Sequence, residues 1–439
     1  MPAPVAEHLG QLEASVAPRL GGRRAWGVWA LSVAFVIYYF SFQTGYAIVN
    51  SRIQKELGLT IAQIAAGAAV YTWVFAVFQF LSGPLLDRIG VRRVLLPAIL
   101  LVTIGIFVFA AATDFTMLIA AQCCVAIGAC AGFVGAGCVG GKWFGMARFS
   151  FMFGLVQFCT ALFSAFNQNV LNWALSAMDW RSAFYLAGGL GIVLLILALL
   201  YLRDPEPTVG RVDDGLHSFA LAVFRSLKTV AAIPHIWLAS AFGALCFGTM
   251  LALGVIWAPK LLMARGLEEN LANTASSFLW IGLAAGCFVL PWASDRLRSR
   301  KVPVLSGIAL QAVSLILLFY YPTQSASLDM ILCLLFGFGN AAHMLAFSTA
   351  ADIVEPGLIG TSAAFVNGAM FVLGGIMISR PGVLVGIGLN AGKAPATLEL
   401  AQFAGRPLII GIFVALAIAL LIRETYPKRG PGQSRGVIA

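Results

Sequence analysis

The sequence predicts an all-α integral membrane protein with twelve transmembrane helices, arranged as two pseudo-symmetric bundles of six. Three observations lead to this fold class. Only 10% of the 439 residues are charged while 60% are hydrophobic, so the chain cannot build a soluble surface. The hydrophobic residues form twelve runs of about 20 residues, the length that spans a bilayer core about 30 Å thick. Charged motifs also recur at one fixed spacing between the two halves of the chain.

The twelve hydrophobic runs are taken as the spans, in chain order. The first is too long for the core of a signal peptide and lacks a small-x-small cleavage site, so we expect it to stay in the protein. The other runs follow at short intervals and are separated by polar or charged residues. The expected spans are 26–49, 61–82, 94–112, 115–140, 149–172, 182–202, 236–259, 272–292, 303–321, 328–350, 358–384 and 405–422.

Lysine and arginine predict the orientation of these spans. An even number of spans places both ends of the chain on one side of the membrane. If that side is the cytoplasm, twenty of the 28 Lys and Arg residues fall in inner segments, seven in outer segments and only Arg380 within a span. Cytoplasmic loops are enriched in these cations, so both termini are predicted to be cytoplasmic, in a plasma (inner) membrane. Topology then explains the net charge of +10, and no nucleic-acid partner is expected.

Two copies of a charged loop divide the chain into halves. The segments 83–93 and 291–301 both carry an Asp-Arg pair followed by further cations, and they lie 208 residues apart. Trp29 and Trp237 keep the same spacing. Charged residues and prolines between the halves are typical of a linker in water. The predicted organisation is a cytoplasmic tail 1–25, a six-helix half 26–202, a cytoplasmic linker 203–233, a second six-helix half 234–422 and a cytoplasmic tail 423–439.

These features resemble the major facilitator superfamily, whose members have two six-helix halves and a G-x-x-x-D-R-x-G-x-R-R motif between spans two and three. The second loop has Pro291 where the first has a glycine. The resemblance implies a transporter that works by alternating access, with no cofactor. The residues that fill the pattern in the first loop are Gly83, Asp87, Arg88, Gly90, Arg92 and Arg93, and those kept in the second are Asp295, Arg296, Arg300 and Lys301.

The charged loops are expected to gate the transporter. Asp87 lies where the second span meets the cytoplasm, so its carboxylate can accept hydrogen bonds from the first amides of a neighbouring helix while pairing with Arg92. The resemblance implies that this neighbour is span eleven, which starts near Gly360. Asp352 and Glu355 are expected to meet the Arg92 and Arg93 cluster. The alternative is that the arginines only orient the chain. The expected gating residues are Asp87, Arg88, Arg92, Asp295, Arg296 and Glu355.

Polar side chains inside the spans are candidates for solute binding. The first span carries a polar stripe at helical spacing, and Gln43 lies nearest its middle. Asn340 and His343 lie one turn apart half-way through span ten, and ionisable groups at that depth are functional by default. Arg380 lies near the outer end of span eleven and can snorkel. The alternative for each is hydrogen bonding between helices. The expected substrate-binding residues are Tyr39, Gln43, Tyr46, Gln157, Asn340, His343, Asn367 and Arg380.

Other motifs are excluded as sites. The glycine pattern at 135–140 matches a dinucleotide loop but follows no strand and lies within a span, so helix packing is the better interpretation. All eight cysteines fall within spans, which favours neither a disulfide framework nor a metal site. No pair of carboxylates or histidine cluster converges at one depth, so an enzyme is not expected. No carboxylate lies mid-span, and Gln122 stands where proton-linked relatives often carry arginine, so proton coupling stays open.

The sequence therefore predicts a secondary active or facilitative transporter of a small polar or anionic organic solute. Import or exchange is favoured, because span five lacks the G-P-x-x-G-G signature that resembles drug-proton antiporters. The alternatives are a non-transporting membrane sensor or scaffold, or an exporter. The expected partners are the solute and the lipid bilayer, without cofactor or metal, and the protein is expected to function as a monomer.

Overall fold

The computed structural model describes residues 21–204, 215–322 and 325–427, and all regular secondary structure within these ranges is helical. Most of the two predicted tails and the middle of the predicted linker lie outside the described residues. Eleven helical segments in the described ranges are long and apolar enough to cross a membrane. The shorter apolar segment Phe149–Ser164 corresponds to the predicted fifth span. The predicted class, an all-α membrane protein of twelve spans, is confirmed.

Three of the twelve spans contain an interruption. In the N-terminal half the spans are α2 (Gly22–Leu57), α3 (Ile61–Ile89), α4 (Val91–Ala110), α5 (Phe115–Ala129) continued by α6 (Gly132–Phe144), α7 (Phe149–Ala177) and α8 (Trp180–Tyr201). In the C-terminal half they are α10 (Pro234–Ala252) continued through the π-helical η3 (Leu253–Trp257) into α11 (Ala258–Ala264), α12 (Glu269–Leu297), α13 (Lys301–Tyr320), α14 (Ala326–Asn340) continued through η4 (Ala341–His343) into α15 (Met344–Ala351), α16 (Ile359–Asn390) and α17 (Leu398–Leu421).

Several helices are longer than the hydrophobic runs that predicted them. The helix α3 continues beyond residue 82 to Ile89, and α16 continues beyond residue 384 to Asn390. Hydropathy marks the part of a helix that lipid surrounds, whereas the hydrogen-bonded backbone continues into the headgroup region. As a result, the first charged loop begins inside α3, and Asp87 is held on a helix rather than on a flexible loop.

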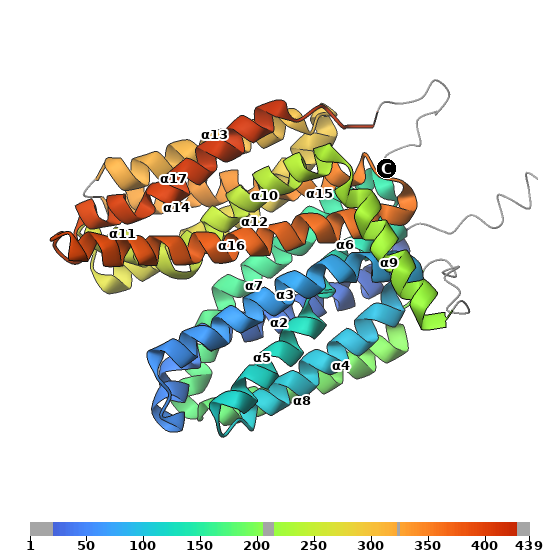
Figure 1. The fold of residues 1–439 in the computed structure, drawn as a ribbon, viewed down its shortest axis with the longest axis horizontal. Helices are drawn as coiled ribbons and strands as arrows, with labels where there is room; N and C mark the ends of the chain where they lie inside the picture. Colours follow the sequence, from blue (N-terminus) through green and yellow to red (C-terminus); the bar gives the residue numbers. More distant parts are fainter. Residues whose placement is uncertain (1–20, 205–214, 323–324, 428–439) are drawn as a thin grey trace, which may run out of the picture.

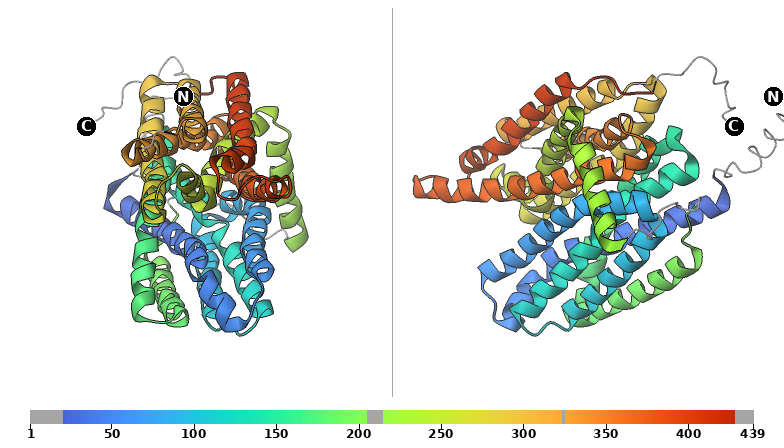
Figure 2. Two further views of the ribbon diagram at one scale, coloured as in Figure 1. Left: turned by 90° about the vertical axis from the view of Figure 1, so that its left-hand side faces the viewer. Right: turned by 45° about the vertical axis from the view of Figure 1, so that its right-hand side comes forward.

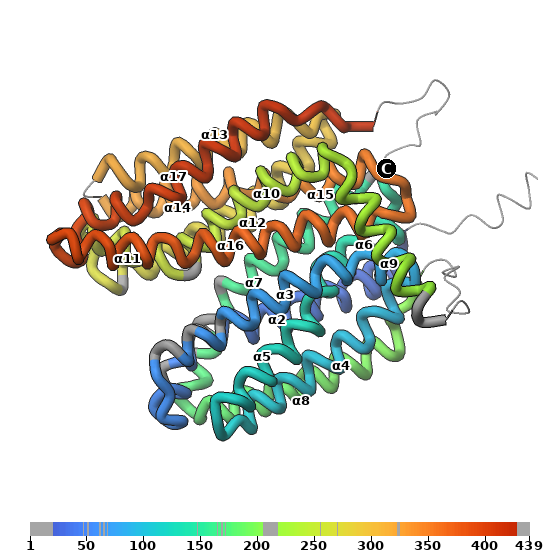
Figure 3. Tube along the Cα trace, viewed as in Figure 1, coloured from blue at the N-terminus to red at the C-terminus, as the bar shows by residue number. Residues whose placement is uncertain are grey.

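The spans form two bundles that meet along two helix pairs. Figure 1 shows the N-terminal bundle, α2 to α8, beside the C-terminal bundle, α10 to α17. The bundles contact each other mainly through α3 with α16 and through α7 with α12. Figure 3 shows α16 running the length of its bundle along this boundary. The helix α2 begins and α17 ends at the same side of the molecule, which we call the terminal side (Figures 1 and 2).

An additional helix lies in the segment that was predicted to be a water-exposed linker. This helix, α9 (Gly215–Ala231), packs against α3 and α16 at the terminal side (Figure 1). The Arg88 side chain fixes it, donating to the Ala222 carbonyl oxygen at 2.8 Å and to the Ser226 hydroxyl at 3.0 Å. The connection between the halves is therefore tied to the same helix pair that joins the two bundles.

The two halves repeat one capping device. Asp204, which follows the last span of the first half, accepts hydrogen bonds from the amides of Val91 and Arg92 at 2.9 and 3.2 Å. Glu424, which follows the last span of the second half, accepts from the amides of Arg300 and Lys301 at 2.8 and 3.3 Å. In both halves an acid satisfies the free amides at the start of the third span.

The side opposite the terminal side holds a buried ion pair. Arg265 and Asp329, each with a side chain 1% exposed, lie 2.6 Å apart. The same guanidinium donates to the carbonyl oxygens of Leu318 and Tyr321 at 2.6 and 3.1 Å, near the end of α13. This pair connects the ends of three spans and belongs to the framework of the C-terminal bundle.

Candidate functional site

The helix pair α3 and α16 is closest at the terminal side. A Cβ atom placed on Gly83 would lie 2.3 Å from the Gly360 carbonyl oxygen and 2.5 Å from the Ala364 Cβ, so only glycine fits. Near mid-depth the same two helices are separated by aromatic rings, Phe75 and Phe371, whose centroids lie 4.2 Å apart. Small residues at one end and large residues further along make the bundles touch at the terminal side and diverge beyond it (Figure 1).

Asp87 fastens this contact. Its Oδ1 accepts a hydrogen bond from the Gly360 amide at 2.8 Å, and its Oδ2 accepts from the Thr361 amide and the Thr361 hydroxyl, both at 2.7 Å. These amides belong to the first turn of α16, where no backbone carbonyl of the helix is available to them and where the helix dipole favours an anion. The predicted contact of Asp87 with the start of span eleven is confirmed.

A second polar contact crosses the same helix pair deeper in the membrane. The Asn367 amide donates to the Gln79 Oε1 at 2.8 Å, and the Gln79 amide donates to the Ser82 hydroxyl at 2.9 Å. All three side chains are buried. Asn367 was expected to bind solute, whereas in this conformation its amide joins the two bundles.

The other helix pair, α7 with α12, is joined by apolar contacts. A Cβ on Gly154 would lie 2.4 Å from the Cys287 carbonyl oxygen and 2.7 Å from the Pro291 ring. The rings of Phe151 and Phe288 pack edge to face beside it, with centroids 5.5 Å apart. The glycine that permits close approach lies on α7 here, so the second charged loop can carry a proline at the position of the first loop's glycine.

Aromatic rings close the space between the bundles at the terminal side. Phe133 on α6 and Phe153 on α7 both pack on Phe347 of α15, with centroids 5.7 and 4.7 Å apart. All three side chains are buried. The Phe153 ring lies directly on Gly137, where a Cβ would be 1.7 Å from a ring carbon. The glycine pattern at 135–140 therefore serves helix packing.

The second charged loop forms an ion cluster within its own half. The Arg300 guanidinium lies 2.9 Å from a carboxylate oxygen of Asp295 and 2.9 Å from one of Asp352. The ring of Tyr426 covers it, with its centroid 4.7 Å from the guanidinium carbon. The cluster joins α12, the end of α15 and the segment after α17, all in the C-terminal bundle.

Two expectations about this rim are wrong. Asp352 pairs with Arg300, not with the basic cluster around Arg92. No ion pair joins Arg92 to Asp87 in the part of the chain that the structure describes, and the Arg92 side chain donates to the Leu199 carbonyl oxygen at 3.0 Å. The physical reason is packing: α12 lies against α14 and α15, so the loop after span ten closes on the loop after span eight.

Among the described residues, the side chains of the remaining expected gating residues form no hydrogen bond or ion pair from one bundle to the other. Arg88 holds α9, as described above, whereas Arg296 and Glu355 are exposed at the terminal side. Their side chains make no hydrogen bond or ion pair with any described residue. The structure thus assigns the polar part of the closed contact to Asp87, Gln79 and their partners on α16.

At mid-depth a layer of aromatic rings crosses from one bundle to the other. Phe75 is flanked by Tyr39 and Tyr71 of its own bundle, with centroids 6.4 and 6.1 Å away. Across the boundary, Phe371 leads to Phe247 and then to His343, the last step having a centroid separation of 4.8 Å. We call this set the mid-depth layer: Tyr39, Tyr71, Phe75, Phe247, His343 and Phe371.

His343 has a defined hydrogen-bonding role. Its Nδ1 lies 2.7 Å from the Asn340 carbonyl oxygen, and a carbonyl can only accept, so Nδ1 carries the proton. In the neutral ring Nε2 is then an acceptor. The Asn340 side chain donates to the Cys246 carbonyl oxygen at 2.7 Å, and Gln311 donates to the same atom at 3.2 Å. The oxygens of both side-chain amides are buried and have no partner among the described residues.

The expected residues of the first and fifth spans divide between two roles. Tyr46 donates its hydroxyl to the Ile64 carbonyl oxygen at 2.8 Å, which is a contact between helices. Tyr39 belongs to the mid-depth layer and packs against Gly132 of α6, where a Cβ would be 2.4 Å from its ring. Gln43 is half-buried and Gln157 is 7% exposed, and neither makes a side-chain hydrogen bond with a described residue. The binding of solute by these two amides stays a prediction.

Arg380 lies away from the mid-depth layer. It is exposed, and it follows Phe371 by nine residues on α16. Nine residues are about two and a half helical turns, which places the two side chains on opposite faces. The structure therefore does not bring Arg380 together with His343 or with the rings around it.

Sequence reasoning missed two residues of this region. Tyr71 is 2% exposed, and its hydroxyl is buried without a partner in the described chain. Gln311 is fully buried on α13 beside Asn340. A signal for Tyr71 was its position one turn before Phe75 on α3. Gln311 stands alone in an apolar run, and only the packing of α13 against α14 identifies it.

The described residues offer no group of three or more His, Cys, Asp or Glu side chains that could hold a metal ion. The eight cysteines are free thiols, buried or half-buried in the helices. Hydrogen-bonding groups and aromatic rings are thus what the mid-depth region offers to a ligand.

Comparisons with known proteins agree with this architecture. Residues 31–379 match the model of the Major Facilitator Superfamily. The chain is 23% identical to the D-galactonate transporter of Escherichia coli O6:H1, over 92% of this chain and 96% of that protein. It is also 23% identical to the hexuronate transporter of Bacillus subtilis, over 86% of this chain and 94% of that protein.

A probable galactarate/D-glucarate transporter of Bacillus subtilis is 24% identical, over 79% of this chain and 81% of that protein. Among solved structures, the human organic anion transporter MFSD10 superposes with a TM-score of 0.68 at 11% identity, over 90% of this chain and 99% of that one. This superposition shows the fold alone. The family match and the relatives show a multi-pass membrane transporter and not an enzyme, and the chain belongs to the major facilitator superfamily.

Proposed function

We propose that this transporter moves a small organic anion that also carries polar groups, by alternating access and in the direction of import or exchange. The relatives named above are transporters of D-galactonate, hexuronate and galactarate or D-glucarate. The solutes in these names share one chemistry, a carboxylate on a small polar skeleton. Identities of 23 to 24% support this class of solute and no single member of it.

The single observation that carries the proposal is the position of the mid-depth layer. It lies just beyond the closed contact between the bundles, where a solute would meet both halves. The groups proposed to bind the solute there are neutral donors and acceptors: Tyr39, Gln43, Tyr71, Gln157, Asn340 and His343.

Neutral groups of this kind can bind an anion. Amide N–H and phenol O–H groups donate to carboxylates, and such charge-assisted bonds are stronger than those between neutral partners. The Nε2 atom of His343 can accept a hydrogen bond from a hydroxyl group of the solute. Arg380 lies on the face of α16 opposite Phe371, so we assign it no contact with the solute and only a long-range attraction of the anion towards the side where the bundles diverge.

We further propose that the terminal side faces the cytoplasm of a plasma (inner) membrane. The distribution of lysine and arginine described above supports this orientation. The conformation is then closed to the cytoplasm, with Asp87 and the aromatic contact at Phe347 as its fastening. Transport would alternate between this state and one in which the halves 26–202 and 234–422 separate at the terminal side, with 203–233 as their connection. Nothing in this cycle requires a second copy of the chain.

The test is uptake by proteoliposomes that contain the purified protein. Radiolabelled D-galactonate, D-glucarate and a hexuronate are offered beside D-galactose, which has no carboxylate. We expect uptake of at least one anion and none of the neutral sugar. His343→Gln and Tyr71→Phe should each reduce anion uptake by about tenfold, the equivalent of about 1.4 kcal/mol. Tyr320→Phe, at a side chain that is 45% exposed, is the matched control and should leave uptake unchanged.

Three results would contradict the proposal. Transport of the neutral sugar alone would exclude the anion class. Normal uptake by both His343→Gln and Tyr71→Phe would exclude the site. Binding of an anion, seen as a rise in the melting temperature, without any flux down or against a gradient would favour the alternative of a membrane sensor.

A further inference from the structure

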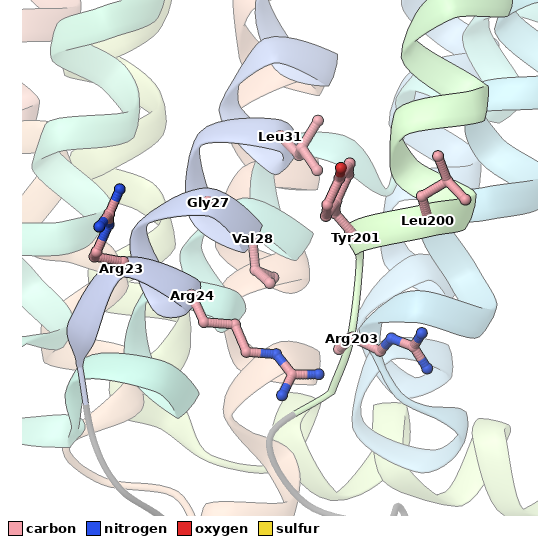
Figure 4. Close-up of a pocket in the computed structure, with 8 residues that line it drawn as sticks. All are labelled: Arg23, Arg24, Gly27, Val28, Leu31, Leu200, Tyr201 and Arg203. Carbon is pink, nitrogen blue, oxygen red and sulfur yellow. The ribbon is translucent and has the colours of Figure 1, made fainter.

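A basic hollow lies on the outer surface of the N-terminal bundle, away from the mid-depth layer. It has a volume of about 380 Å³ and opens between the first turns of α2 and the end of α8, at the terminal side. Figure 4 shows the residues that form it. The lining residues are Arg23, Arg24, Gly27, Val28, Leu31, Leu200, Tyr201 and Arg203.

No described carboxylate pairs with the arginines of this hollow. In Figure 4 the Arg24 side chain extends towards the segment after α8, whereas the Arg203 guanidinium points away from Arg24 and Arg23 points to the other flank of α2. None of the three forms an ion pair with a carboxylate of the described chain. The nearest acid in sequence, Asp204, is already occupied by the first amides of α4. Within the described ranges, the Arg24 and Arg203 guanidinium groups thus have no acidic partner and can bind an anion.

The hollow lies at the depth of the lipid headgroups. Tyr201 is 61% exposed and Trp26, at the start of α2, is 47% exposed. Exposed tyrosine and tryptophan at the ends of spans mark the boundary between headgroups and hydrocarbon. In Figure 4 the side chains of Arg24 and Arg203 lie beyond the end of α8, whereas those of Leu31 and Leu200 lie on its inner side. The charges thus face the headgroup layer and the leucines face the hydrocarbon.

A second hollow continues along the same helices towards the middle of the membrane. It has a volume of about 420 Å³ and lies between α2, α7 and α8. On α2 its lining residues Ala34, Ile37 and Ser41 follow Val28 and Leu31 at steps of three or four residues, so the two hollows share one face of that helix. The other walls are mostly apolar side chains of α7 and α8.

We propose that this α2–α8 surface is a binding site for a phospholipid with a net negative headgroup. The phosphate lies at the Arg24 guanidinium, the Arg203 side chain turns towards it from the other wall of the hollow, and one acyl chain follows α2 past Leu31 into the second hollow at Ala34. Basic pockets between transmembrane helices bind anionic headgroups, and each nearby Lys or Arg contributes about 1 kcal/mol near an anionic surface. The site is independent of the transported solute.

The experiment compares thermal unfolding of the purified full-length protein with four additions: phosphatidylglycerol, phosphatidylcholine of the same chain length, glycerol phosphate and inorganic phosphate. Two variants with equal loss of charge are tested. Arg24→Gln/Arg203→Gln removes the site, whereas Arg148→Gln/Arg225→Gln removes two exposed arginines elsewhere on the described chain. Native mass spectrometry counts the lipids that remain bound.

We expect phosphatidylglycerol to raise the melting temperature of the native protein and of the Arg148/Arg225 control, and to remain bound to both. The Arg24/Arg203 variant should bind it about tenfold or more weakly, as the loss of two contacts of about 1 kcal/mol each predicts. Ala34→Trp, which fills the second hollow, should weaken the binding of a long-chain lipid more than that of a short-chain lipid. Equal responses of both double variants would overturn the site. If glycerol phosphate or inorganic phosphate raises the melting temperature as much as phosphatidylglycerol does, the ligand is not a phospholipid and the hollow binds phosphate instead.

Discussion

The two charged loops of this transporter share an Asp-Arg pair followed by further cations, but they have different partners. In the N-terminal half, Asp87 crosses to the other bundle and binds the first turn of α16. In the C-terminal half, Asp295 stays within its own bundle and pairs with Arg300. The helix pair beside the first loop therefore has a polar fastening, whereas the pair beside the second loop is joined by Gly154, Pro291 and phenylalanine rings.

The difference shows that pseudo-symmetry of sequence does not require the same contacts in both halves. A hydrogen-bonded carboxylate is directional and is lost when the donor helix moves, so it can fasten one state and be absent from another. Apolar surfaces tolerate sliding and small rotations more readily. We infer that the α3–α16 contact works as the latch and that the α7–α12 contact works as the support about which the bundles rock.

Loss of the latch should have the largest effect. Asp87→Asn keeps the shape of the side chain but offers one oxygen where three donors now converge. Hydrogen bonds to charged groups contribute about 1.5–3 kcal/mol each, so we expect uptake to fall by about tenfold to a hundredfold. The measurement is initial uptake in proteoliposomes with equal amounts of inserted protein.

Asp295→Asn is the matched control for that variant. It removes one charge from a cluster in which Asp352 still pairs with Arg300, so uptake should fall by no more than about threefold, less than 1 kcal/mol. If both variants lose activity equally, the two loops have the same function and the comparison fails.

Replacement of the glycine at either contact between the bundles should have an effect of intermediate size, and the effect should be similar at the two contacts. Gly83→Val would press a side chain against the backbone of α16, and Gly154→Val would press one against the backbone of α12. Overpacking of this kind costs about 1–3 kcal/mol. We expect both variants to show a lower melting temperature and increased labelling of Cys138, which lies within α6, by a membrane-permeant maleimide. Gly386→Val, on α16 with no neighbour within 4 Å, is the control. Unchanged labelling in both variants would argue against close contact at the terminal side.

The buried contact between Asn367 and Gln79 should matter less than Asp87 but more than surface residues. Asn367→Ala leaves the Gln79 oxygen without its donor, at a cost of about 1–3 kcal/mol. We expect a faster opening of the terminal side and a change in maximal uptake rate, with little change in the solute concentration that gives half-maximal uptake. A large change in that concentration alone would instead indicate that Asn367 contacts the solute.

The smallest effect is expected at the caps that the two halves share. Burial alone would raise the pKa of Glu424, but hydrogen bonds from the Arg300 amide, the Ser299 hydroxyl and the Tyr426 amide outweigh it and hold the pKa below its usual range. A lowered pKa in the folded state stabilises the protein above the usual pKa, and this stabilisation is lost as the pH falls through the lowered value. Glu424→Gln should therefore lower the melting temperature slightly at neutral pH. As the pH is lowered, the melting temperature of this variant should fall less than that of the parent protein. If the melting temperatures of the variant and the parent fall equally as the pH is lowered, Glu424 does not have this role.

Sequence reasoning predicted the parts of the site that depend on local rules. The contact of Asp87 with the start of span eleven followed from the free amides of a helix N-terminus together with the family resemblance. The partner of Asp352 could not be predicted in this way. Counting the cations in each loop shows which acidic loops need a cationic partner. Only the packing of α12 on α15 shows that the loop after span ten lies near the loop after span eight.

The same limit applies to the polar stripe of the first span. Tyr39, Gln43 and Tyr46 share one face of α2, and a single face of a helix in a bundle meets more than one neighbour. Tyr46 reaches the backbone of α3, whereas Tyr39 joins the mid-depth layer. Helical periodicity gives the direction of a side chain relative to its own helix, and the position of the next helix decides its partner.

The most direct test of the latch is a distance measurement across the terminal side. Spin labels are attached at Arg93 and Glu355, exposed positions in opposite halves beside the α3–α16 contact, in a protein whose eight native cysteines are replaced. Electron double resonance then gives the distance distribution for the parent protein, Asp87→Asn and Asp295→Asn. We predict a predominantly short distance in the parent and in Asp295→Asn, and a shift towards a longer distance in Asp87→Asn. A longer distance in Asp295→Asn with no change in Asp87→Asn would show that Asp87 is not the latch.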